Sequence, residues 1–143
     1  MEISFFSHEI PFILEKQESV KSWLLFLVEK EGENLIDLTY VFVSDDYLLE
    51  LNKTHLDHDY YTDILTFPYS QEGEPIHGEI YISIDRVREN ANTYNIPHED
   101  EIFRVMAHGL LHLLGYADHD ETDIQVMRSK ENEALVAWKT GTF

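Results

Sequence analysis

"HGLLHLLGYADHD", residues 108–120, sets two histidines into a leucine-rich run that a glycine closes. Apolar side chains cover most of the circumference of a helix over residues 98–114, which predicts a helix buried nearly all round. Four residues advance a helix by about 400°, so His108 and His112 lie about 40° apart on one face. Gly115 then supplies a natural left-handed cap. The segment predicts a buried helix with two imidazoles at its edge.

Two imidazoles on a buried face need bonding partners. Burying one without a partner costs roughly 1–3 kcal/mol, and a single divalent metal ion serves both rings. Past Gly115 the chain can turn back and offer Asp118 or His119 as a third ligand, which leaves a fourth position open, as in catalytic zinc sites. The alternative is a pair of core histidines hydrogen-bonded to buried carboxylates, Glu79 or Asp63 for example. We expect the metal site, because a turn with polar residues follows the histidines directly.

Composition limits the partners and the chemistry of such a site. A chain of 143 residues has the length of one domain, residues 1–143. Cysteine is absent, so His, Asp and Glu are the strong ligand candidates. Ten Lys and Arg against 28 Asp and Glu give a net charge of −18, which argues against non-specific nucleic-acid binding. With no secretory signal pattern and no apolar run near the roughly 18 residues of a membrane span, we expect a cytoplasmic protein without a membrane partner.

Short strands alternate with helices on the N-terminal side of the histidine segment. This pattern predicts an α+β fold, with a mixed sheet of about four strands, about five packed helices and the metal site at the end of the buried helix. The last two strands are close enough in sequence to pair as a hairpin. The expected strands are 2–7, 35–44, 62–67 and 78–84, with a further piece at 10–14; the expected helices are 15–31, 47–53 after an N-cap at 44–46, 85–95, 98–114 and 120–138.

The histidine spacing also occurs in metalloproteases, where the residue after the first histidine is a glutamate that acts as general base. Here that residue is Gly109. Peptide hydrolysis on that template lacks its base, although Asp63 or Glu79 could act on water from a neighbouring strand.

The segment resembles the signature of the YbeY family, H-G-x-L-H-L-x-G-Y-D-H. Upstream, Thr62-Asp-Ile-Leu-Thr-Phe-Pro68 is similar to the family's Thr-Asp-Val-Leu-Ser-Phe-Pro, and Gly78-Glu-Ile80 to its Gly-Asp-Ile strand. With Leu51-Asn52, the similarity covers most of residues 48–120 in the family's order. Three ordered motifs are far more specific than any one of them.

The resemblance implies a metal-dependent endoribonuclease of ribosomal RNA maturation and ribosome quality control, with RNA, and ribosomes or ribosomal proteins, as partners. It implies one Zn²⁺ ion held by His108, His112 and a third ligand, which activates water or polarises a phosphoryl oxygen to cleave single-stranded RNA. Ala117 is extra relative to the pattern, so the third-ligand position falls on Asp118 and the histidine follows at His119. Ligand chemistry favours His119, which we expect as the third ligand, and register favours Asp118 as the alternative. Asp63 and Glu79 are the candidate catalytic carboxylates.

One departure concerns the substrate. The family carries an arginine after its Leu-Asn pair that is thought to engage phosphate, and its position holds Leu56 here. Leucine cannot replace a bidentate phosphate contact. Lys53, His55 and His58 are candidate substrate-binding residues that compensate; the alternative is that all three are solvated turn residues. Two other functions therefore stay open: a metallohydrolase acting on peptides or small molecules, and a non-catalytic ribosome assembly factor with a structural metal.

Overall fold

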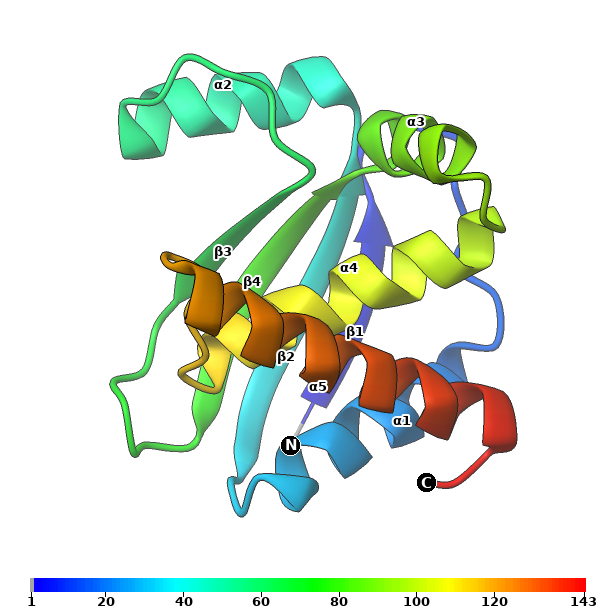
Figure 1. Cartoon of the computed structure of the whole chain (residues 1–143). Coiled ribbons are helices and arrows are strands. Elements are labelled where there is room, and N and C mark those ends of the chain that lie inside the picture. Colours follow the sequence, from blue (N-terminus) through cyan, green and yellow to red (C-terminus); the bar gives the residue numbers. More distant parts are fainter. Residues whose placement is uncertain (1) are drawn as a thin grey trace.

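The computed structural model describes residues 2–143, which form one mixed four-stranded sheet and five helices, as the sequence predicts (Figure 1). The elements in chain order are β1 (Glu2–Ser7), α1 (Gln17–Lys30), β2 (Leu35–Val43), α2 (Asp45–Leu56), β3 (Ile64–Pro68), β4 (Ile76–Ser83), α3 (Ile84–Tyr94), α4 (His98–Leu113) and α5 (Glu121–Thr140).

The strands lie in the order β1-β2-β4-β3. β1, β2 and β4 are parallel, and β3 pairs antiparallel with β4, which confirms the predicted hairpin. Its register sets Ile64 opposite Ile82 and Phe67 opposite Glu79. β3 is therefore an edge strand, and its first residues lie at the end of the sheet where β4 passes into α3.

Alternation along the strands divides the core between the two faces of the sheet. Ile80 and Ile82 belong to the main core, to which α1, α4 and α5 contribute, and these helices lie in front of the sheet in Figure 1. Tyr81 lies between them in sequence and packs in a second, smaller cluster built on Val43, Leu48 and Leu65. Leu48 belongs to α2, so α2 covers the opposite face. Because alternate residues of a strand point to opposite faces, only every second residue of β4 faces α4.

α4 packs closely against the main-core face. The Tyr40 hydroxyl donates to the Met106 carbonyl over 2.9 Å. A Cβ at Gly109 would stand 2.7 Å from the Ile64 side chain and 2.9 Å from that of Ile80, so glycine allows this approach. Gly109 faces the sheet, which means that a glutamate at this position would point into packed side chains.

Several boundaries differ from the sequence expectation. Residues 10–14 form no strand; Pro11 lacks the backbone donor that a strand ladder needs. Ser83, and not Asp85, caps α3, because its hydroxyl accepts from the Arg86 amide over 3.1 Å. The expected cap at Ser44 is confirmed. Among the described residues, no helix combines the length and apolar character that crossing a membrane requires.

Candidate metal centre

The C-terminal turn of α4 brings the polar residues after it back to the helix. Gly115 has φ +104°, and its amide bonds the His112 carbonyl over 3.0 Å while the Tyr116 amide bonds the Leu111 carbonyl over 3.0 Å. This pair of bonds is a Schellman motif with glycine at the left-handed position. The predicted cap at Gly115 is confirmed, and the reversal directs residues 116–118 toward the histidine face.

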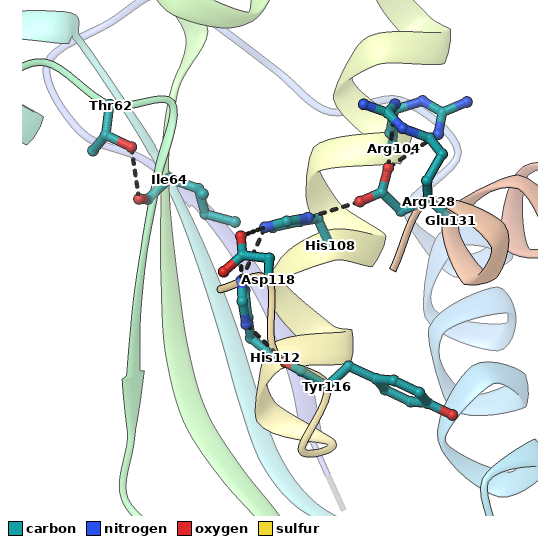
Figure 2. Close-up of polar contacts among 9 residues, drawn as sticks. All are labelled: Thr62, Ile64, Arg104, His108, His112, Tyr116, Asp118, Arg128 and Glu131. Carbon is teal, nitrogen blue, oxygen red and sulfur yellow. Dashed lines mark hydrogen bonds and ion pairs between the residues drawn. The ribbon is translucent and has the colours of Figure 1, made fainter. Parts of the chain in front are cut away.

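Both rings are fixed through Nδ1. The Nδ1 of His112 donates to the Tyr116 carbonyl over 2.9 Å, and the Nδ1 of His108 donates to the Glu131 carboxylate over 2.7 Å (Figure 2). Since both partners are acceptors, the hydrogen-bond network assigns the proton of each neutral ring to Nδ1. The two Nε2 atoms then turn their lone pairs toward each other, 2.9 Å apart. That arrangement calls for a cation or a proton between them.

Asp118 adds a third acceptor at the same place. Its Oδ2 lies 3.5 Å from Nε2 of His108 and 3.4 Å from Nε2 of His112. Two ligands of a tetrahedral zinc ion, each about 2.1 Å from the metal, stand about 3.4 Å apart. The distances from the carboxylate oxygen to the two nitrogens match this value. To bind the same ion, the two Nε2 atoms would move apart by about half an ångström from their present distance of 2.9 Å. In the described residues 2–143, the ligand atoms of these three side chains lie within 4.8 Å of one another, close enough to bind one divalent metal ion. The structure brings Asp118, and not His119, to the histidines.

Glu131 joins the site from α5, where it is 4 % exposed. Burial acts to raise the pKa of its carboxyl, but hydrogen bonds from His108 and Arg104 outweigh it and hold the pKa below its ordinary value. The Arg104 guanidinium lies 3.0 Å away and Arg128 lies 3.5 Å away. Glu131 therefore stays ionised and orients the His108 ring, as carboxylates behind metal-bound histidines do.

We expect Glu131→Gln to weaken metal binding by roughly 10–100-fold, the range that partners of metal ligands contribute. The amide keeps the shape but loses the charge that strengthens the His108 ring as a ligand. Competition with a chromophoric chelator measures the change. Glu133→Gln is the matched control, since Glu133 lies on the exposed side of α5 and pairs with Lys30 and Lys130. Equal affinity in both variants would contradict the role of Glu131.

Metal affinity should also depend on pH. Burial disfavours the charged His108 ring, but the hydrogen bond and charge of Glu131, with the charges of Asp118 and Asp63, outweigh it and raise the pKa of His108 above its ordinary value. A protonated ring cannot bind metal, so protons compete with the ion already above the usual histidine range. Calorimetric titrations should show affinity falling about tenfold per pH unit below that pKa. An affinity independent of pH would contradict this competition.

A cleft of about 540 Å³ opens beside His108. Its wall includes Asp118 and Asp63, the residue that precedes β3. Burial raises the pKa of Asp63, and the opposing charge of His108 lowers it by less. The structure thus places the predicted carboxylate Asp63 in the same cleft as His108 and Asp118.

Glu79 lies on the other side of the sheet. Its two neighbours in β4 face α4: Gly78 lies against the Leu113 side chain, and the Ile80 side chain lies against Gly109. The strand pleat turns Glu79 away from α4, where the Tyr69 and Tyr81 hydroxyls donate to it over 3.0 and 3.3 Å. The structure does not bring Glu79 to the histidines, either as a hydrogen-bond partner or as a base.

The three predicted substrate-binding residues do not line the cleft. Lys53 forms ion pairs with Glu50 and Asp59. The His55 ring meets Phe67 edge-on, and the His58 ring stacks on Tyr60. All three are exposed around the end of α2 and the loop after it.

Sequence reasoning missed Glu131 as a partner of the site. The signal was present, since Glu131 follows Met127 and precedes Leu135 at the four-residue spacing of a buried helix stripe. A carboxylate within such a stripe requires a buried partner.

The comparisons with known proteins agree with the resemblance seen in the sequence. The model of the family described as Endoribonuclease YbeY matches residues 3–139. A protein of that description from Cytophaga hutchinsonii is 44 % identical over 133 residues, covering 93 % of this chain and 93 % of the relative. One from Flavobacterium psychrophilum is 45 % identical over 130 residues, covering 91 % and 92 %.

The fold also matches a solved structure. The solution structure of the Thermotoga maritima protein TM1509 aligns with a TM-score of 0.66 at 28 % identity, covering 98 % of this chain and 93 % of that one. The histidine motif, the match along nearly the whole chain and the shared fold lead to one conclusion. The chain belongs to the YbeY family of endoribonucleases.

Proposed function

We propose that this protein is a zinc-dependent endoribonuclease that cleaves single-stranded RNA, with ribosomal RNA as its substrate. The observation that carries the proposal is the convergence of His108 Nε2, His112 Nε2 and an Asp118 oxygen beside an open cleft. A three-ligand site with a free position suits catalysis rather than a purely structural role. When bound, the ion would supply Lewis-acid stabilisation of a phosphoryl oxygen or activation of water.

Asp118 is the third ligand in this proposal, in place of the expected His119. The Schellman turn sets its carboxylate against both rings, whereas His119 is exposed beyond it. Zinc accepts carboxylate oxygen and imidazole nitrogen at similar distances, so the exchange preserves a competent ligand set. The nitrogen and oxygen donors of this ligand set suit zinc. A cytoplasmic location is a separate prediction.

Asp63 is the general acid-base residue in this proposal. Its carboxyl lines the cleft beside His108, and burial raises its pKa above the ordinary value, the direction that favours proton exchange by a carboxyl group. Its side chain would accept the proton of the attacking oxygen or return a proton to the leaving oxygen. Its backbone is held in place because the Asp63 carbonyl accepts from the Ser83 amide over 3.0 Å.

The ribonuclease and metallohydrolase functions are separated by one assay. Zinc-loaded protein is incubated with single-stranded ribosomal RNA and with a peptide pool, beside the His112→Ala variant and metal-free protein. We expect RNA cleavage that needs both zinc and His112, with intact peptides. Peptide cleavage that depends on zinc and His112 while RNA stays intact would overturn the proposal. Lower thermal stability on metal removal, with neither substrate cleaved, would favour an assembly factor with a structural metal.

A further inference from the structure

The cleft beside the metal centre extends well beyond it. Its volume of about 540 Å³ lies within the range of sites that bind small ligands, roughly 300–1,000 Å³. The end of α3, the polar face of α4 and the first half of α5 line it, and α4 lies between the other two helices in Figure 1. Part of the cleft therefore lies apart from His108, between the three helices.

Hydrogen-bond acceptors dominate this space. Four carboxylates line it, namely Asp63, Glu101, Asp118 and Glu131. The two arginines of the lining, Arg104 and Arg128, both form ion pairs with Glu131. A cleft of this composition suits the groups of a nucleotide that donate hydrogen bonds, which belong to its base and ribose, better than its phosphate.

Glu101 stands out among these acceptors. It is 6 % exposed, and its side chain lines the cleft. Within residues 2–143 its carboxyl has no hydrogen-bond or ion-pair partner, because the nearby arginines bond Glu131 instead. Burial and the charge of Asp63 raise the pKa of Glu101. Its carboxyl oxygens remain accessible from the open cleft, where they can accept hydrogen bonds from a bound ligand in place of water.

The walls of the cleft provide stacking surfaces for such a partner. Tyr94, at the end of α3, is 66 % exposed and lines the cleft from one side. Arg128 lines it from α5, and its side chain is 61 % exposed. Aromatic rings and guanidinium planes are the groups on which unpaired RNA bases stack.

We propose that this cleft binds one unstacked guanine of the RNA and that Glu101 determines the specificity for it. Guanine presents N1–H and N2–H side by side on its Watson–Crick edge, and two parallel donors match the two oxygens of a carboxylate. The other bases do not present two adjacent N–H donors on that edge. The inference rests on the proposed function, since it assigns the base next to the scissile site.

The test compares guanine with inosine, which lacks the 2-amino group. Zinc-loaded full-length protein is titrated into fluorescein-labelled 2′-O-methyl hexamers of sequence UUGUUU and UUIUUU, which resist ribonucleases, and anisotropy reports binding. We expect the wild type to bind the guanine hexamer about tenfold more tightly, the value of one hydrogen bond to a charged group. Glu101→Gln should reduce this preference to less than about twofold, since one carbonyl oxygen remains as acceptor. Glu99→Gln, an exposed charge change on the same helix, should keep it.

Three results would overturn the inference: no preference for guanine in the wild type, an undiminished preference in Glu101→Gln, or the loss of a zinc ion from Glu101→Gln in elemental analysis. The last would show that Glu101 supports metal binding and does not select a base. The comparison of the two hexamers on the wild type does not depend on the folding of any variant. Because binding is measured, a guanine preference without cleavage would overturn the proposed function alone.

Discussion

Replacing Asp118 by asparagine is expected to weaken zinc binding by more than about 100-fold, beyond the 10–100-fold effect of a residue behind the ligands. Asparagine keeps the size of the side chain but removes the negative charge that faces both Nε2 atoms. The neutral amide oxygen is a poor zinc ligand, and the site would keep only two imidazoles. RNA cleavage at limiting zinc should fall with the affinity. Competition with a chelator of known affinity measures the loss.

His119→Gln is the matched control for this prediction. His119 is exposed next to Asp118 in sequence, and the structure does not bring it to the histidine pair. We expect its zinc affinity to stay within about twofold of the wild type, the range of a neutral surface substitution. The opposite pattern, with affinity lost in His119→Gln and kept in Asp118→Asn, would return the third-ligand role to His119.

Asp63→Asn should reduce kcat for RNA cleavage by about 10²–10⁴-fold while zinc affinity changes little. The amide occupies the same space in the cleft but cannot accept a proton at neutral pH. Burial raises the pKa of Asp63. An asparagine at this position would be buried to the same extent, so the variant changes the proton-accepting group and not the packing of the cleft. Single-turnover kinetics at saturating zinc separate this step from metal binding.

Asp59→Asn provides the comparison, because Asp59 is an exposed carboxylate of the same segment that pairs with Lys53. Its kcat should stay near that of the wild type. An Asp63→Asn enzyme whose kcat lies within about threefold of the wild type would remove Asp63 from the catalytic step, because general acid-base catalysis contributes far more.

Local patterns were sufficient to predict the fold. Hydrophobic periodicity located the helices, β-branched runs located the strands, and the short separation of 62–67 from 78–84 predicted the hairpin. The strand predicted at 10–14 is wrong, because a short apolar run occurs both in strands and in buried loops. Leu14 is buried, but it packs against the core from irregular backbone.

The site was predictable where its geometry is local and not where it depends on tertiary structure. His108 and His112 are one helical turn apart, so periodicity alone sets them on one face. The exclusion of Glu79 depends on which face of β4 meets α4, and the inclusion of Glu131 depends on the packing of α5 on α4. Spacing along the chain indicates that Glu131 is buried, but it determines neither the partner of Glu131 nor the face of β4 that packs against α4.

The most direct test of the account is the metal content of purified protein, measured by elemental analysis beside the His108→Ala/His112→Ala double variant. The account predicts one zinc ion per chain in the wild type and none in the double variant, with both proteins folded by circular dichroism. One zinc ion per chain retained in the double variant would place the metal elsewhere and contradict the central claim.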